Sequence, residues 1–264
     1  MTSRLQDKWI LITGASSGFG AAAAQAFAAT GARLLLGARR VERLAEVAGA
    51  ARRAGAASVH FHFLDVSKTS SVEAFAAWAR TTIQAEAEPK HLHVLVNNAG
   101  GALGLDPVAR GLDADWETML QTNVLGVLRM TRALLPLLPQ HAGASILNIG
   151  SYAGHTAYEG GSAYCAAKAG ELQVTRVLRL ELNGTGIRVS SIDPGLALTE
   201  FSLVRFKGDA ARAEAVYAGT EPLTADDIAE IMVWVAGRPP HVNIDELLVK
   251  PTDQAATHKV YRRT

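Results

Sequence analysis

The sequence predicts one doubly wound α/β domain over residues 1–264, with a seven-stranded parallel sheet and helices on both of its faces. Three observations lead to this fold class. Short apolar runs alternate with helical patterns from the first residues onward, which is typical of a parallel sheet covered on both sides. Hydrophobic residues make up 48% of the 264 residues, enough for one sizeable core. A glycine-rich turn directly follows the first apolar run.

Each strand is predicted where a short run rich in Val, Ile and Leu is bounded by turn residues. These runs cover residues 9–12, 33–36, 59–64, 94–96, 145–149, 187–192 and 247–249. Between them, apolar residues recur with the period of a helix. The helices are expected over residues 21–29, 41–54, 72–86, 116–138, 163–182 and 228–235. The long helix is expected to break near Pro136, because proline cannot donate a backbone hydrogen bond.

Residues 196–220 fit neither pattern. This segment is long and mixed in character, and we expect a lid or substrate loop there. The rest of the chain contains no internal repeat, low-complexity tract or linker. One domain therefore accounts for the sequence.

The charge and cysteine content exclude several classes of protein. The formal net charge is +1, so neither nucleic acid nor an anionic membrane surface is indicated as a partner. Cys165 is the single cysteine, which excludes an internal disulfide and suits a reducing compartment. Residues 1–6 do not resemble a signal peptide, and no apolar run reaches the length of a membrane span. The eight histidines show no metal-ligand spacing. We expect a cytoplasmic protein without a metal site.

The turn after the first strand predicts a nucleotide site. It reads Thr-Gly-Ala-Ser-Ser-Gly-Phe-Gly over residues 13–20 and opens the first helix. Its candidate cofactor-binding residues are Gly14, Ser16, Ser17, Gly18, Phe19 and Gly20. Glycines let the backbone approach a pyrophosphate, and the free N–H groups at a helix N-terminus attract its charge. A glycine turn alone is weak evidence, but the surrounding strand and helix favour a Rossmann-type dinucleotide site.

The second strand is followed by Arg39 and Arg40, with no acidic residue. Sites that select NAD place an acid there for the ribose hydroxyls, whereas a guanidinium pairs with the 2′-phosphate of NADP. We therefore expect NADP(H) as the cofactor, with Arg39 favoured over Arg40 and Ser16 assisting. The alternative is that both arginines are solvated residues at a helix start.

Two further strand ends complete the predicted cofactor site. After the third strand, Asp65 can accept from the adenine amino group while Val66 packs on the ring, or Asp65 only caps a helix. After the fourth strand, the small residues Ala99 and Gly100 allow close approach of a ribose. Asn97 contacts the cofactor or holds the backbone together, and the two roles are compatible.

Tyr164 and Lys168 indicate proton chemistry. They stand four residues apart in an alanine-rich helical run, which places both on one helix face. An ammonium beside a phenol favours the phenolate, which is the basic form. Ser151, on the preceding loop, can hold a substrate oxygen against the tyrosine. Together these side chains are suited to moving a proton on or off an alcohol.

These segments together resemble the short-chain dehydrogenase/reductase family. The matching pieces, in chain order, are residues 13–20, Asp65, residues 97–100, Asn123, Ser151, Tyr164, Lys168, Pro194, Gly195 and Thr199. The resemblance implies that Tyr164 is the acid and base, that Lys168 binds the nicotinamide ribose, and that Ser151 orients the substrate oxygen. It also implies that Asn123 supports a water in a proton relay, and that Thr199 contacts the nicotinamide carboxamide after the Pro-Gly turn.

A closer resemblance, to the branch of NADP-dependent 3-hydroxy acid dehydrogenases, rests on residues 115–119, 148–151, 199–209 and 241–244. That branch implies a small substrate such as serine, allo-threonine or 3-hydroxypropionate. The substrate carboxylate needs a partner, and Arg205 and Lys207 in the lid segment are candidates. The alternative is that both are solvated or intersubunit charges. The loop at residues 152–159 departs from the branch and contains His155, a further candidate substrate contact.

Two other functions stay open. The unusual loop at residues 152–159 suits an NADPH-dependent carbonyl reductase for bulkier neutral ketones or diketones. A sensor or scaffold that binds NADP without chemistry is the non-enzyme alternative, and the complete set of four family catalytic residues argues against it. The resemblance also implies a homotetramer whose helices around residues 116–138 and 163–182 pair between subunits.

Overall fold

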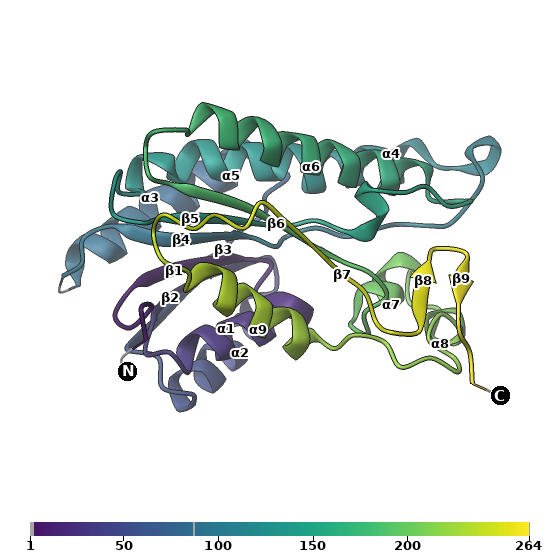
Figure 1. Ribbon diagram of the computed structural model, residues 1–264, viewed down its shortest axis with the longest axis horizontal. Coiled ribbons are helices and arrows are strands. Elements are labelled where there is room, and N and C mark those ends of the chain that lie inside the picture. The colour runs from purple at the N-terminus through teal and green to yellow at the C-terminus, as the bar shows by residue number, and fades with distance from the viewer. Residues whose placement is uncertain (1–2, 87, 264) are drawn as a thin grey trace.

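A seven-stranded parallel sheet forms the centre of the computed structural model, which describes residues 3–86 and 88–263 (Figure 1). The strands are β1 (Trp9–Thr13), β2 (Arg33–Ala38), β3 (Ser58–Phe63), β4 (Leu92–Asn97), β5 (Ser145–Ile149), β6 (Arg188–Pro194) and β7 (Glu246–Val249). Their order across the sheet is β3-β2-β1-β4-β5-β6-β7, which confirms the predicted fold class. The order reverses between β1 and β4, and such a reversal opens a crevice beyond the carboxyl ends of the strands. The first two residues of the polar start lie outside the described residues.

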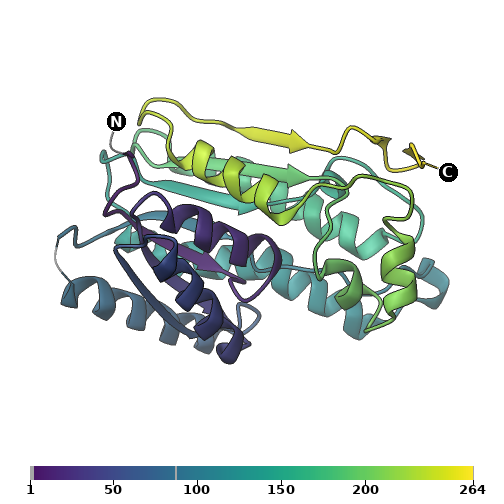
Figure 2. The same ribbon diagram turned by 90° about the horizontal axis from the view of Figure 1, so that it is seen from below.

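Helices cover both faces of the sheet (Figures 1 and 2). One face carries α1 (Gly18–Ala28), α2 (Val41–Arg53) and α9 (Ala225–Ala236). The other carries α3 (Thr69–Ala85), α4 (Asp113–Leu120), α5 (Gly126–Leu134) and α6 (Ser162–Glu181). Successive strand residues point to opposite faces. In β1, Ile10 and Ile12 therefore belong to the core with α1 and α9, whereas Trp9 and Leu11 belong to the core with α3 and α5. Two buried faces fix the strand register, so the strand ends align at one edge.

The predicted helix over residues 116–138 is divided in the structure. After α4, a π-helical turn η2 (Gln121–Leu125) leads into α5, and the 3-10 turn η3 (Leu135–Leu137) contains Pro136. The break near Pro136 agrees with the prediction. The π-helical turn was not predicted, because one widened turn leaves the apolar period almost unchanged. Two other 3-10 turns are η1 (Val108–Arg110) and η4 (Tyr152–Gly154).

Segments far apart in the sequence gather beyond the carboxyl end of the sheet (Figure 1). The predicted lid over residues 196–220 contains two short helices, α7 (Phe201–Arg205) and α8 (Ala210–Ala215). Beside them lies a C-terminal hairpin of β8 (Gln254–Ala256) and β9 (Lys259–Val260), which was not predicted. Strands of two and three residues are too short to show an alternating pattern. Arg262 joins the two parts by donating to the Val216 carbonyl at 3.1 Å. Over the described residues, no helix is both long and apolar enough to cross a membrane.

Candidate active site

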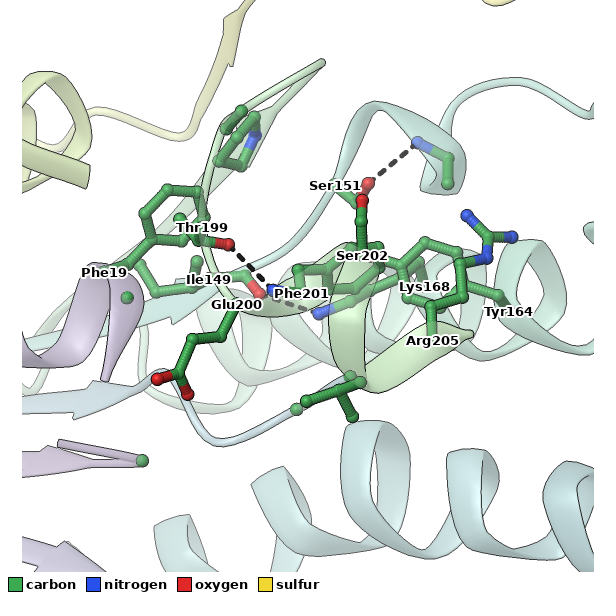
Figure 3. Close-up of a pocket in the computed structure, with 18 of the residues that line it drawn as sticks. Phe19, Ile149, Ser151, Tyr164, Lys168, Thr199, Glu200, Phe201, Ser202 and Arg205 are labelled. Atoms are coloured by element: carbon green, nitrogen blue, oxygen red, sulfur yellow. Dashed lines mark hydrogen bonds between the residues drawn. The ribbon is translucent and has the colours of Figure 1, made fainter. Parts of the chain in front are cut away.

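A pocket of about 810 Å³ lies at the carboxyl end of the sheet (Figure 3). Its wall combines the turn after β1, the ends of the neighbouring strands, α6, the lid segment and the C-terminal hairpin. Most predicted site residues line it, namely Gly14, Ser16, Ser17, Gly18, Phe19, Arg39, Arg40, Asp65, Val66, Ala99, Gly100, Ser151, Tyr164, Lys168, Pro194, Gly195, Thr199 and Arg205. The fold thus assembles one concave site from segments distributed over most of the chain.

The turn after β1 lets the backbone approach a ligand closely. Gly14 has a φ of +66° and Gly18 a φ of +51°, in the left-handed region that favours glycine. A Cβ on Gly14 would lie 2.9 Å from the Cα of Ala99, so a side chain there would push the two turns apart. The Thr13 hydroxyl accepts from the backbone N–H groups of Asn98 and Ala99 at 3.0 and 2.9 Å. These bonds hold the ends of β1 and β4 together where α1 begins, with the positive end of its dipole at the pocket.

The two arginines after β2 have different surroundings. Arg40 donates to the Ser17 hydroxyl at 2.6 Å and pairs with Glu200 at 2.9 Å. Partial burial acts to raise the pKa of Glu200, but Arg40 and Arg43 outweigh it and hold that pKa below its ordinary value. Arg39 lines the pocket, and no ion pair engages it within the part of the chain that the structure describes. Its guanidinium is therefore available to an anion.

Asp65 and Asn97 serve the protein's own structure. The Asp65 carboxylate accepts from the backbone N–H and the hydroxyl of Ser67 at 3.0 and 2.7 Å, a local turn interaction, while the residue still lines the pocket. Asn97 is buried outside the pocket wall. It donates to the side chains of Asn148 and Thr131 at 2.9 and 3.2 Å. Of its two predicted roles, the structure supports holding the backbone, here by tying β4 to β5 and α5.

Tyr164 and Lys168 lie one turn apart on α6, in the wall of the pocket (Figure 3). Lys168 is buried, and its Nζ donates to the Ile149 carbonyl at 2.8 Å and to the Glu171 carboxylate at 2.7 Å. Burial acts to lower the pKa of Lys168, but the attraction of Glu171 and Tyr164 outweighs it and raises the pKa above its ordinary value. Lys168 is therefore a protonated ammonium at neutral pH, one helical turn from Tyr164.

Ser151 and Asn123 are positioned by turns. The Ser151 hydroxyl caps η4 by accepting from the Ala153 N–H at 3.1 Å, which leaves Ser151 at the pocket wall. Asn123 lies in the π-helical turn, a feature often found at functional sites. Its side chain accepts from the Gly101 N–H at 3.0 Å and donates to the Gly101 carbonyl at 2.9 Å. Asn123 thus stands behind the wall and holds the loop after β4 next to Lys168.

Arg205, at the end of α7, lies among aromatic rings at the pocket (Figure 3). Its Cζ is 5.6 Å from the ring centroid of Tyr164 and 5.4 Å from that of Tyr158. It donates to the Gly104 carbonyl at 3.0 Å and to the Tyr158 hydroxyl at 2.8 Å. Burial raises the pKa of Tyr158 to about 12 although Arg205 opposes the shift, so this phenol stays neutral. A guanidinium has five N–H donors, and Arg205 therefore retains donors for a substrate anion.

Besides Asn97 and Asn123, three more of the predicted site residues lie away from the pocket wall, each for a clear structural reason. His155 bonds through Nε2 to the buried Asp193 carboxylate at 2.9 Å. Lys207, at a φ of +53°, pairs with Asp115 at 2.8 Å on the surface. Gly20 lies behind the turn, where the lack of a side chain serves close packing. Two of the four predicted substrate contacts, His155 and Lys207, are thus engaged elsewhere, whereas Ser151 and Arg205 line the pocket.

The pocket also contains residues that the sequence did not indicate, namely Tyr158, Glu200, Phe201, Gln254 and Arg262. They come from loops, from the start of the five-residue helix α7, and from the hairpin and the residues after it, and these segments are too short or irregular to show a periodic pattern. Glu171 was also missed, although its spacing of three residues from Lys168 in a helix is a signal for an interacting pair. Within the described residues, no group of three or more His, Cys, Asp or Glu could hold a metal ion.

Known proteins resemble this chain in sequence and in structure. Residues 8–208 match the family model of short chain dehydrogenases. The chain is 46% identical over 249 residues to sulfoacetaldehyde reductase 2 of Chromohalobacter salexigens, which covers 93% of this chain and 95% of that protein. It is 43% identical over 265 residues to the NADP-dependent 3-hydroxy acid dehydrogenase of Schizosaccharomyces pombe, with 99% of each covered. The solved closed form of serine dehydrogenase complexed with NADP+ matches with a TM-score of 0.86 at 40% identity, over 97% of this chain and 100% of that one.

Proposed function

The chain belongs to the short-chain dehydrogenase family, and from this premise we propose that it is an NADP-dependent oxidoreductase acting on a small 3-hydroxy acid. The reaction interconverts the alcohol group of the substrate and the corresponding carbonyl. In this proposal, the single domain predicted over residues 1–264 binds the cofactor and the substrate together in the pocket at the carboxyl end of the sheet. A cytoplasmic location stays a prediction from the sequence.

The residues present fit NADP(H). Gly14 and Gly18 leave room for a pyrophosphate at the start of α1. Arg39 would pair with the 2′-phosphate, and Arg40 and Ser16, which are hydrogen-bonded to each other at 3.4 Å, line the same pocket. The adenine, ribose and nicotinamide would be held by Asp65, Val66, Ala99, Gly100, Pro194, Gly195 and Thr199. NADP(H), when bound, supplies or accepts the hydride. The yeast relative and the serine dehydrogenase complex, both named with NADP, support this cofactor.

Tyr164 handles the proton. In oxidation its phenolate takes the proton from the substrate hydroxyl, and in reduction the neutral phenol returns it to the carbonyl oxygen. Ser151 holds the same oxygen by a hydrogen bond from the pocket wall. The Lys168 ammonium favours the phenolate by its charge, and its remaining N–H would bind the nicotinamide ribose. Asn123 fixes the loop after β4 beside this lysine.

The position of Arg205 carries the proposal of a small acid. A guanidinium binds a carboxylate or sulfonate through paired hydrogen bonds. The Arg205 Cζ lies 5.6 Å from the Tyr164 ring centroid, so a short substrate whose acidic group is bound by Arg205 can also reach Tyr164. Serine, 3-hydroxy acids and sulfoacetaldehyde, which appear in the names of the relatives, are all short and carry an acidic group.

A carbonyl reductase for bulkier neutral ketones is the second candidate. It is favoured by apolar side chains in the pocket wall, namely Phe201, Val204, Phe206 and Val216. NADPH oxidation with malonic semialdehyde and with a neutral aryl ketone separates the two functions. A higher kcat/KM for the aryl ketone would favour the second candidate. A binding protein without chemistry would turn over neither, and it would have no use for the converging Ser151, Tyr164 and Lys168.

Replacing Tyr164 by Phe tests the chemistry. The substitution removes only the hydroxyl that carries the proton, so we expect turnover to fall by about 10²–10⁴-fold. NADPH binding, followed by fluorescence, should stay within about twofold of the unchanged protein, because the ring and Lys168 remain. Substantial turnover in Tyr164→Phe would contradict the proposed mechanism.

A further inference from the structure

A buried acid lies directly behind the lysine of the proposed proton-transfer site. Glu171 follows Lys168 by three residues on α6 and is only 2% exposed. Its Oε2 accepts from the Lys168 Nζ at 2.7 Å. Burying a carboxylate is costly unless it is paired and hydrogen-bonded. The function proposed above assigns no role to this carboxylate.

The contacts of Lys168 show what Glu171 does to the ammonium. An ammonium has three N–H groups, and two of them have fixed partners, the Glu171 carboxylate and the Ile149 carbonyl at 2.8 Å. The third N–H is left for the pocket, whose wall contains both Lys168 and Tyr164. Glu171 therefore determines the direction of the ammonium and offsets part of its charge beside the phenol.

Other charged groups also face this pair. Asp193 on β6 acts electrostatically on both Lys168 and Glu171. The Asp193 carboxylate itself accepts from the Ser191 hydroxyl at 2.6 Å and contacts His155 at 2.9 Å. Burial raises the pKa of Glu171 to about 7, with Lys168 opposing the shift and Asp193 adding to it. Glu171 therefore becomes charged as the pH rises through neutrality.

Building on the proposed function, we propose that Glu171 is a positioning residue of the proton-transfer site, which orients the Lys168 ammonium and sets how strongly that ammonium stabilises the Tyr164 phenolate. A nearby negative charge raises the pH at which each neighbouring group loses its proton. Removing that charge should therefore shift the whole pH profile of alcohol oxidation toward lower pH. A purely structural contact would instead lower the rate by the same factor at every pH.

The test compares Glu171→Gln with a matched control, Glu181→Gln, at an exposed position near the end of the same helix. The Gln side chain keeps the shape and the acceptor oxygen but loses the charge. In Glu171→Gln we expect both limbs of the kcat profile for 3-hydroxypropionate oxidation to move down by about one pH unit, with KM for NADP+ within about twofold. The control profile should not move. An unshifted profile with a uniformly lower kcat in Glu171→Gln would overturn the proposal.

A second variant keeps the proposal testable if Glu171→Gln does not fold. Glu171→Asp retains the charge but draws it back by one methylene. We expect its pH profile to stay in place while kcat falls by about five- to tenfold, because the ammonium is held less closely. An unchanged kcat in Glu171→Asp would contradict positioning by Glu171.

The wild-type protein, without any substitution, serves as the positive control. If it shows no NADP(H)-dependent turnover of any carbonyl compound, the proposed function fails rather than the role of Glu171. In that case NADPH affinity, measured by fluorescence over the same pH range, still tests the inference, because the oriented ammonium faces the pocket. Affinity should be lost at a lower pH in Glu171→Gln than in the unchanged protein, and identical curves would overturn the inference.

Discussion

Arg205 and Lys207 are two neighbouring cations with different surroundings. Arg205 lies at the pocket between aromatic rings, where a weakly hydrated planar guanidinium is well accommodated. Lys207 follows α7 in a left-handed conformation, and its side chain points to the surface carboxylate of Asp115. At the scale of single residues, the recognition of an acidic substrate therefore rests on Arg205.

Replacing Arg205 by Ala should raise KM for acidic substrates far more than for neutral ketones. Hydrogen bonds to charged groups contribute about 1.5–3 kcal/mol, so we expect KM for a 3-hydroxy acid to rise by about 10- to 100-fold. Lys207→Ala is the matched control, since it removes an exposed ion pair of little energetic weight. Steady-state kinetics on both substrate types measure the effect, and equal changes in KM for acids and ketones would refute the assignment.

At the scale of elements, the turn between β2 and α2 is tied to the start of α7. Glu200, which precedes α7, pairs with Arg40 and Arg43 at 2.9 Å each. These partly exposed pairs contribute only about 0–1 kcal/mol each, so their effect is to orient the lid more than to stabilise the fold. Arg40 is thus engaged in an ion pair with the lid segment, whereas Arg39 lines the pocket without such a partner among the described residues.

This division of roles predicts different results for the two arginines. Arg39→Ala should raise KM for NADP+ by about tenfold or more while leaving KM for NAD+ nearly unchanged, because only NADP+ carries the 2′-phosphate. In Arg40→Ala the discrimination between NADP+ and NAD+ should change less. The measurement is kcat/KM for both cofactors in the two variants. A larger loss of discrimination in Arg40→Ala would reverse the assignment.

At the scale of the whole molecule, one outer face exposes apolar side chains. The helical layer of α4, η2, α5 and α6, at the top of Figure 1, carries the exposed side chains of Leu120, Leu125, Leu128, Val177 and Leu180. Large exposed apolar patches are typical of protein interfaces, and these five side chains lie on neighbouring elements. These side chains belong to the segments that the family resemblance predicts to pair between subunits, and the homotetramer stays a prediction.

A charge in this face should disrupt the predicted assembly. Leu180 is 77% exposed, so Leu180→Asp adds a charge without disturbing the core. By light scattering after gel filtration, we expect the unchanged protein near four times its chain mass of 27.9 kDa and the variant at a lower mass. Thr81→Asp, at an exposed position on α3, is the control and should keep the assembly. A monomeric unchanged protein would contradict the prediction.

Patterns local in the sequence were enough to predict the fold class, the glycine turn and the Tyr164–Lys168 pair. These features depend on local spacing. Apolar residues that recur every two residues indicate strands, and a period of 3.6 residues indicates helices. Glycines are typical of left-handed turns, and an interval of four residues places two side chains on one helix face. The segment over residues 196–220 contains two helices that are too short to show a period, and its role as a lid stays a prediction.

Which of two neighbouring side chains reaches the pocket could not be predicted from the sequence and became visible in the folded chain. In the structure Arg205 lines the pocket, whereas Lys207 pairs with Asp115 on the surface. The His155 side chain bonds to Asp193, and Glu171 accepts from Lys168. The fold also brings the C-terminal hairpin to the pocket wall. The physical reason is that these outcomes depend on contacts between segments far apart in the chain. Such contacts follow from packing and burial, and they leave no periodic mark in the sequence.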